Sequence, residues 1–132
     1  MLLLDTHIWL WWLLGSANLP DKQRSALDHL ADLGGLRVSA ISLWEVQMLH
    51  AKGRLQLDRP FAEWIGRAAA PDVVGIIPLT VSVVQAINEL PASFHGDPAD
   101  RVIVATALAT QLPLASQDKA IRTCGLVEIW GL

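Results

Sequence analysis

Four short segments, each about the length of one β-strand, recur along the chain between longer segments with helical spacing, and the first of them is a continuous apolar run. They are Met1–Leu4, Leu36–Ala40, Val73–Leu79 and Leu114–Ser116, and a further segment at Val127–Trp130 predicts a terminal strand. A run with no polar face is typical of a strand buried on both sides of a parallel sheet. Since parallel neighbours need crossover connections, the pattern predicts an α/β fold in three layers, with a central parallel sheet of four to five strands flanked by helices.

The segments between the strands carry the spacing and the end signals of helices. The first predicted helix follows Asp5 through Leu14, and the others span Asp21–Leu33, Ser42–Lys52, Pro60–Ala70, Val81–Leu90 and Pro98–Gln111, with a brief turn or helix after Asp118. Ser42 and Glu45 have the spacing of a capping box. Asp97 and Pro98 are predicted to be the N-cap and first position of the long helix near the C-terminus.

The composition bounds the possible classes of protein. At 132 residues the chain is expected to form one domain, residues 1–132. The single cysteine, Cys124, excludes an internal disulfide framework and suits a reducing cytoplasm. The apolar N-terminal run is interrupted by Asp5 and is shorter than the roughly 20 residues of a membrane span, so we expect no membrane contact. The net charge of −3 predicts no broad basic surface for nucleic acid.

Acidic side chains follow the predicted strands. Asp5 comes directly after the first strand, Glu45 lies one turn into the helix after the second, and Asp118 follows the run ending at Ser116. Asp100 lies in the first turn of the helix before that run. Each acid alone could be a helix cap or an exposed turn residue, because acids favour helix starts. Together they are expected at the carboxyl edge of the sheet, where open α/β sheets bind ligands.

Carboxylates that converge in this way repel one another unless protons or cations intervene. Ligation by oxygen alone suits Mg²⁺ or Mn²⁺, whereas the four histidines show neither helical metal spacing nor the cysteine partners that zinc favours. A carboxylate-bound cation activates water and stabilises charge on a phosphodiester. It would also reverse the local field that a phosphate meets. The acids therefore predict divalent-metal phosphoryl or phosphodiester chemistry, and they leave the substrate open.

Four segments also occur in the order and spacing of one known family. They are Leu3–His7, Ile41–Glu45, His95–Arg101 and Ser116–Asp118. This set resembles the signature segments of the PIN-domain ribonucleases, above all the VapC-type toxins of type II toxin–antitoxin systems. The resemblance implies a Rossmann-like PIN fold with strand order 3-2-1-4-5 and Mg²⁺ or Mn²⁺ at the acidic edge. It also implies endonucleolytic cleavage of RNA that inhibits translation or growth, a homodimer, and neutralisation by a cognate antitoxin.

Carried over residue by residue, the resemblance assigns the catalytic and metal site. Asp5 and Asp100 become the principal metal ligands, and Glu45 and Asp118 complete the site directly or through water. Where the family usually has a bulky aromatic side chain this chain has Ala99, a departure that bears on local packing.

Supporting residues surround these acids. Thr6 and Ser116 are expected to supply hydroxyl groups that orient the ligands. Asp97 is expected to bind backbone N–H groups as an N-cap. Arg101 is expected to pair with Asp97, with a phosphate contact as the alternative. Further candidates for contacts with RNA are His95, Lys52, Arg54, Lys119 and Arg122, for which an ordinary solvated surface is the alternative.

Two other features bear on partners and on rival functions. Trp9, Trp11 and Trp12 cannot all face one side of a helix, so at least one is expected to be exposed as a dimer or antitoxin contact. A Mg²⁺-binding signalling receiver would want an acidic pair after the first strand, and a haloacid-type phosphatase would want an acid at the position of His7. A catalytically silent RNA-binding or interaction module is the third alternative.

Overall fold

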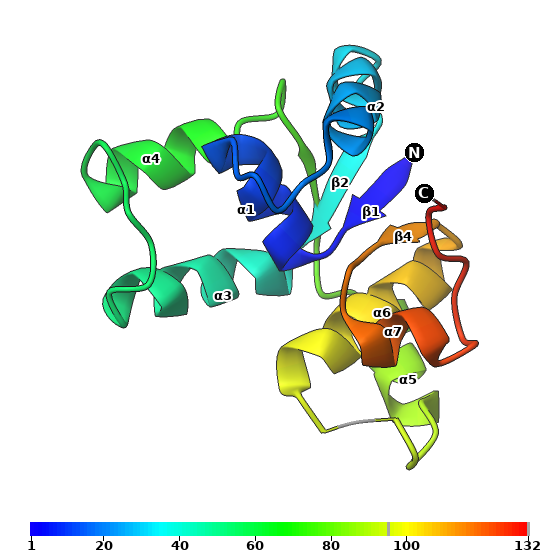
Figure 1. Ribbon diagram of the computed structural model, residues 1–132. Coiled ribbons are helices and arrows are strands. Elements are labelled where there is room, and N and C mark those ends of the chain that lie inside the picture. Colours follow the sequence, from blue (N-terminus) through cyan, green and yellow to red (C-terminus); the bar gives the residue numbers. More distant parts are fainter. Residues whose placement is uncertain (95, 132) are drawn as a thin grey trace.

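A computed structural model describes residues 1–94 and 96–131 of the chain. At its centre lies a parallel four-stranded sheet in the order β3-β2-β1-β4. The strands are β1 (Leu2–Leu4), β2 (Leu36–Ser39), β3 (Gly75–Ile77) and β4 (Leu114–Ala115). β1 lies between β2 and β4 (Figure 1). Its Leu3 is opposite Arg37 of β2 and Leu114 of β4. The predicted α/β class and the order of the first four strands are confirmed.

The predicted terminal strand at Val127–Trp130 is reduced to a single parallel bridge. Ile129 pairs with Leu114 of β4, whose N–H donates to the Glu128 carbonyl and whose carbonyl accepts from the Trp130 N–H, both at 2.9 Å. β4 itself has two residues. Because so short an edge offers few partners, the fifth position of the predicted order 3-2-1-4-5 is filled by a bridge and not by a full strand.

Seven helices in the described residues connect and cover the strands. They are α1 (Thr6–Leu14), α2 (Asp21–Asp32), α3 (Ala40–Ala51), α4 (Phe61–Ala68), α5 (Val81–Glu89), α6 (Pro98–Thr110) and α7 (Lys119–Thr123). None of the helices in the described part of the chain is long and apolar enough to cross a bilayer.

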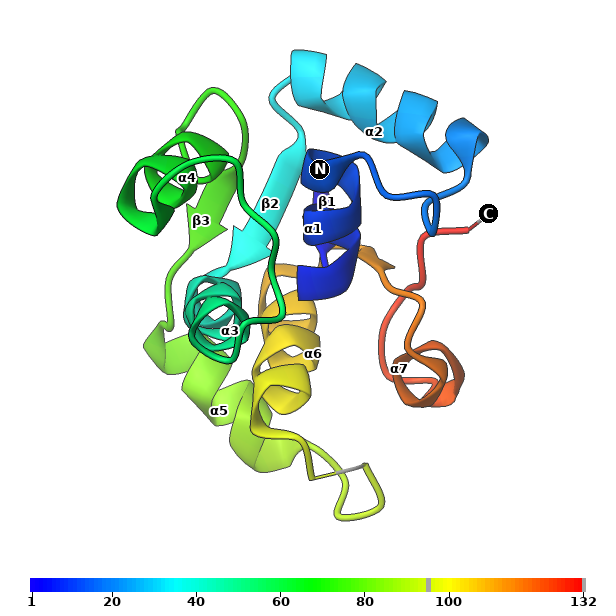
Figure 2. The same cartoon turned by 60° about the vertical axis from the view of Figure 1, so that its left-hand side comes forward.

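The strand β1 alternates between two hydrophobic cores. Leu2 and Leu4 join the core that contains residues of α1, α2, α3 and α4, whereas Leu3 joins the core formed with α5, α6 and α7. All three leucines are at most 2% exposed. Helices therefore bury both faces of the sheet, which explains the continuous apolar run at the N-terminus. α5 and α6 also pack on each other (Figure 2).

The start of α3 differs from the predicted capping box. Its N-cap is Ser39, whose hydroxyl accepts from the Ile41 N–H at 3.2 Å. Ser42 lies inside the first turn and is fully buried. The helix begins at Ala40, directly after β2, so an earlier serine takes the capping role and Ser42 is free to face the sheet edge.

The start of α6 has the predicted form. The Asp97 carboxylate accepts from the Asp100 N–H at 3.1 Å, and Pro98 occupies the first helical position. Residues 103–107 of the helix are buried in the second core. The N-cap and the buried part of α6 together fix the position of Asp100 at the edge of the sheet.

The N-cap predicts a difference between two variants of Asp97. Asn keeps the acceptor oxygen and Ala removes it, so Asp97→Ala is expected to be less stable than Asp97→Asn by about 1 kcal/mol. Both changes remove the same charge, which leaves the cap as the difference. Urea denaturation measures it, and equal free energies of unfolding for the two variants would contradict the assignment of Asp97 as the cap.

Candidate active site

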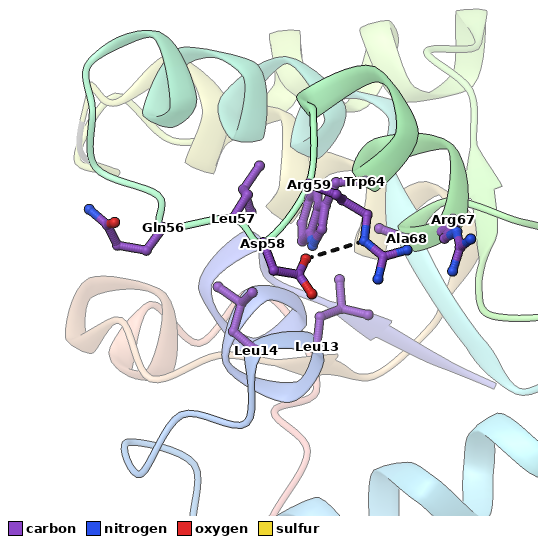
Figure 3. A pocket seen from close by; sticks show the side chains of 9 residues that line it. All are labelled: Leu13, Leu14, Gln56, Leu57, Asp58, Arg59, Trp64, Arg67 and Ala68. Carbon is purple, nitrogen blue, oxygen red and sulfur yellow. Dashed lines mark hydrogen bonds and ion pairs between the residues drawn. The ribbon is translucent and has the colours of Figure 1, made fainter.

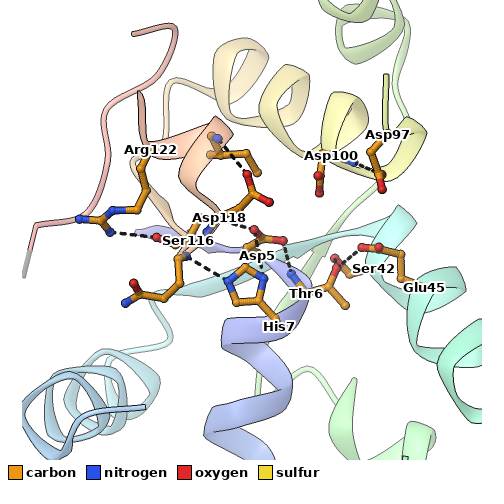
Figure 4. A network of polar contacts seen from close by, with 12 residues as sticks. Asp5, Thr6, His7, Ser42, Glu45, Asp97, Asp100, Ser116, Asp118 and Arg122 are labelled. Carbon is orange, nitrogen blue, oxygen red and sulfur yellow. Dashed lines mark hydrogen bonds and ion pairs between the residues drawn. The ribbon is translucent and has the colours of Figure 1, made fainter. Parts of the chain in front are cut away.

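Four carboxylate side chains come from four different elements at the carboxyl edge of the sheet. Asp5 is the N-cap of α1 after β1, Glu45 lies on α3 after β2, and Asp118 is the N-cap of α7 after β4. Asp100 lies in the first turn of α6. Figure 4 shows them around one region, with Asp5 between Asp118 on one side and Glu45 on the other.

Asp5 is the most deeply held of the four, with 3% of its surface exposed. Its Oδ1 accepts from the Thr6 N–H at 2.7 Å, and its Oδ2 accepts from the Ser116 hydroxyl at 2.6 Å. Burial raises the pKa of this carboxyl above its ordinary range, although His7 and the two hydrogen bonds act in the opposite direction. The network therefore fixes the orientation of the Asp5 carboxylate. Its neighbours do not fully compensate for the effect of burial on its negative charge.

His7 also orients Asp5, a role that the sequence pattern did not reveal. Its Nε2 accepts from the Gln117 N–H at 3.0 Å, and its Nδ1 faces Asp5 at 3.4 Å from Oδ2. The ring also meets the edge of Trp11, with centroids 4.9 Å apart. The available signal was the position of His7 in the first turn after Asp5, where its side chain can turn back toward the cap.

Thr6 links Glu45 to the site. Its hydroxyl donates to Oε1 of Glu45 and lies 2.8 Å from the hydroxyl of the buried Ser42. Burial is the main cause that raises the pKa of Glu45, and the charges of Asp5 and Asp97 add to it. Ser42 thus supports the site from inside α3, whereas its spacing to Glu45 had suggested only a helix cap.

Ser116 joins two of the acids. While its hydroxyl donates to Asp5, the same oxygen accepts from the Asp118 N–H at 3.0 Å. Asp118 in turn caps α7 by accepting from the Ile121 N–H at 3.0 Å. Arg122 donates to the Ser116 carbonyl at 2.9 Å, so this guanidinium holds the loop (Figure 4).

We expect Ser116→Ala to lower the rate of any reaction at this site by about 10- to 100-fold, the usual effect of removing a group that orients a ligand. The decrease follows because Oδ2 of Asp5 and the N–H of Asp118 would no longer share a partner. Ser25→Ala, at an exposed position of α2, is the matched control and should leave the rate unchanged. Equal rates for the two variants would show that Ser116 is not needed for orientation.

Asp100 carries the clearest electrostatic signature of the site. Partial burial and the negative charges of its neighbours raise its pKa to about 7. Those neighbours are Asp5, Asp97, Asp118 and Glu45. The charges of the other three members of the predicted site and of the cap residue thus all act on Asp100, which shows that the five carboxylates share one region.

Two supporting residues remain, Arg101 and His95. The first has a different partner from the one expected, and the second lies outside the described residues. Within residues 1–94 and 96–131, Arg101 forms no ion pair with Asp97 and donates instead to the Phe94 carbonyl at 3.4 Å. The helix start already binds the Asp97 carboxylate, so the arginine turns toward the preceding loop. His95, a candidate for contact with RNA, lies outside the described residues.

The donor set fits a hard divalent cation. All four acids offer carboxylate oxygens, which Mg²⁺ and Mn²⁺ prefer. In residues 1–94 and 96–131, no three His, Cys, Asp or Glu side chains already converge as a complete ligand set. Mutual repulsion of uncompensated carboxylates favours such separation, and the raised pKa of Asp100 shows how unfavourable a further negative charge is there. A bound cation would offset the repulsion between the carboxylates and would lower the pKa of Asp100.

A cavity of about 460 Å³ lies away from these acids, between the end of α1, residues 56–59 and α4 (Figure 3). Apolar side chains such as Leu13, Leu57 and Trp64 line it. Its acid, Asp58, is paired with Arg59, whose Nε lies 3.2 Å from Oδ1. The carboxylate of this cavity is therefore already paired with a cation, and the candidate active site is the acidic edge of the sheet.

Comparison with known proteins identifies the family. The family model described as PIN domain matches residues 2–125. Ribonuclease VapC22 of Mycobacterium tuberculosis (strain ATCC 25618 / H37Rv) is 36% identical over 121 residues, which cover 92% of this chain and 89% of that protein. The receiver and phosphatase alternatives therefore do not describe this chain.

Solved structures show the same fold. VapBC2 from Rickettsia felis, bound to a DNA fragment from its promoter, matches with a TM-score of 0.73 and 17% identity, covering 98% of this chain and 96% of the other. FitAcB from Neisseria gonorrhoeae matches with a TM-score of 0.66 and 22% identity, covering 99% and 97%. With the family model spanning nearly the whole chain and a relative above one-third identity, the chain belongs to the PIN-domain family and is of the VapC type.

Proposed function

We propose that this chain is a divalent-metal-dependent endoribonuclease that acts in the cytoplasm and cleaves RNA phosphodiester bonds. The observation that carries the proposal is the placement of four carboxylates at the carboxyl edge of the sheet, where burial and the neighbouring charges raise the pKa of Asp100 to about 7. The relative named Ribonuclease VapC22 supports RNA as the substrate. A catalytically silent interaction module would have no reason to keep this unfavourable concentration of charge.

Asp5 and Asp100 are the proposed direct ligands of Mg²⁺ or Mn²⁺, and Glu45 and Asp118 complete the site directly or through water. Ser116 and His7 hold Asp5, and Thr6 holds Glu45, so the ligands are oriented before a cation enters. When bound, the cation would lower the pKa of a water molecule and stabilise negative charge on the phosphodiester. The buried floor beneath Asp5 excludes bulk water from one side of the reaction.

The proposed biological role is that of the toxin of a toxin–antitoxin pair, which inhibits translation or growth until a cognate antitoxin neutralises it. The similar solved structures include VapBC2 from Rickettsia felis and a toxin–antitoxin complex from Klebsiella pneumoniae. We further propose a homodimer, supported by exposed apolar side chains at the start of α5, where Val81 is 73% exposed and Val84 is 50% exposed. Sedimentation velocity tests the dimer. The unaltered chain should sediment as a dimer, and Val81→Asp should sediment as a monomer because it places a charge in the proposed interface.

The function is tested by incubating the purified chain with labelled single-stranded RNA in Mg²⁺, in Mn²⁺ and in excess chelator. Cleavage at internal positions is expected with either cation, none is expected in chelator, and re-addition of metal should restore it. Cleavage that persists unchanged in chelator, or an intact RNA in both metals, would contradict the proposal.

A further inference from the structure

A groove of about 320 Å³ runs from the acidic site along α3. Glu45 and Asp97 line the end next to the site, and Lys52 and Arg54 line the other end. Trp44 and Met48 line the stretch between them. The groove thus joins the carboxylates to two cations through an apolar surface, and its volume falls in the usual range of ligand pockets.

Trp44 is unusually exposed for a tryptophan, with 52% of its surface accessible. It belongs to neither of the two hydrophobic cores, whereas its neighbour Leu43 packs on the first core. The expectation that a tryptophan of α1 would be exposed is wrong, because Trp9 is fully buried and Trp11 and Trp12 pack partly buried on the same core. Among the described residues, the tryptophan that is more than half exposed therefore lies on α3 next to Glu45 and not on α1.

The basic end of the groove has the complementary charge for a phosphate. Lys52 and Arg54 are both exposed, and the ion pairs among residues 1–94 and 96–131 include neither of them. Lys52 is eight positions beyond Trp44, which corresponds to roughly 12 Å along a helix axis. The Lys52 ammonium group therefore lies outside the carboxylate cluster. It can bind a phosphate next to the phosphate of the bond that the acidic site would cleave.

We infer that this groove binds the part of a single-stranded RNA that flanks the cleaved bond, with a nucleobase stacked on Trp44 and a phosphate bound by Lys52 and Arg54. The inference rests on the proposed function, because the groove would bind a further part of the same RNA strand that the acidic site would cleave. An aromatic platform beside cations is the usual recognition device for single strands, since every base has a face that can stack. The groove opens directly onto Glu45, which makes RNA the favoured occupant over a protein segment.

Three variants test the two ends of the groove. Trp44→Ala is expected to weaken binding of an uncleavable 2′-O-methyl RNA by about 5- to 100-fold, whereas Trp44→Phe should keep most of the affinity because it keeps a stacking ring. RNA should also quench tryptophan fluorescence in the unaltered chain, and Trp44→Phe should lose that quenching while it still binds. The double variant Lys52→Ala with Arg54→Ala should reduce the slope of log affinity against log salt by about 0.7 for each phosphate that the protein no longer neutralises.

Lys22→Ala, an exposed lysine on α2, is the matched control and should change neither affinity nor slope. If the unaltered chain cleaves RNA and Trp44→Ala binds and cleaves equally well, the groove inference is overturned and the proposed function stands. If Trp44→Ala keeps RNA binding but no longer retains a co-expressed antitoxin, the groove is a protein contact and the inference is also overturned. A chain that neither binds nor cleaves RNA in Mg²⁺ or Mn²⁺ would overturn both.

Discussion

Asp100→Asn is expected to abolish RNA cleavage and, in metal-free buffer at pH 8, to make the protein more stable. The loss of cleavage follows because an amide is a poor ligand for a hard cation and carries no charge to hold it. We expect a decrease of at least about 1,000-fold, similar to the removal of other groups that act on the transition state. The gain in stability follows because the substitution removes a charge that the folded state disfavours.

The pH dependence of this gain has a definite sign. The pKa of Asp100 is about 7 in the folded protein and about 3.9 in the unfolded chain, so the native state holds a proton that the unfolded state releases. The free energy of unfolding therefore falls as pH rises from about 4 to 7. Since Asp100 is only half-buried, solvent screening reduces the effect to on the order of 1–2 kcal/mol.

Thermal denaturation of the two proteins across pH measures the effect. The melting temperature of Asp100→Asn should exceed that of the unaltered chain by about 3–6 °C at pH 8, and the difference should shrink to nothing near pH 4. Asp72→Asn, on an exposed turn before β3, should show no such trend. A variant that is less stable than the unaltered chain at pH 8 without metal would contradict the electrostatic description of the site.

Asp5 gives the second large effect, and here two substitutions should separate charge from hydrogen bonding. Both Asp5→Asn and Asp5→Ala are expected to lose cleavage by at least about 1,000-fold, because each removes a proposed direct ligand. Asn keeps an acceptor for the Thr6 N–H and a polar group beside the Ser116 hydroxyl, whereas Ala leaves both buried groups without their partner. Each buried group left unpaired costs roughly 1–3 kcal/mol.

Asp5→Ala should therefore unfold at a clearly lower urea concentration than Asp5→Asn, although both lack the same charge. Removal of the buried negative charge stabilises both variants equally, so this gain cancels when the two variants are compared with each other. In a comparison with the unaltered chain, the gain would offset the free energy lost with the hydrogen bonds. Equal midpoints would show that the network around Asp5 contributes little to folding. Retained cleavage in either variant would remove Asp5 from the proposed ligands.

The features that could be predicted from the sequence are those that depend on local pattern. A strand buried on both faces has no polar residues, so β1 was recognisable from its three leucines, and the convergence of the acids follows from the rule that ligands bind at the carboxyl ends of parallel strands. The cap of α6 was also predictable, because Asp97 and Pro98 are adjacent and their signal is local. The sheet order came from the family resemblance and not from the pattern.

The features that could not be predicted depend on contacts between distant segments. Ser42 has the spacing of a helix cap, and only the packing of α3 against the start of α1 turns it toward Thr6. His7 orients Asp5 by accepting from the backbone of Gln117, which is 110 positions away in the chain. The terminal strand was predicted from its apolar residues, but its length depends on how much edge β4 offers.

We propose that Asp5, Glu45, Asp100 and Asp118 hold a divalent cation on which RNA cleavage depends. Anomalous diffraction from crystals soaked in Mn²⁺ would locate that cation. We expect a peak at coordination distance, about 2 Å, from carboxylate oxygens of both Asp5 and Asp100, and no such peak in crystals of Asp100→Asn. Crystals of active protein with no peak between these two carboxylates, or with Mn²⁺ bound only elsewhere, would contradict it.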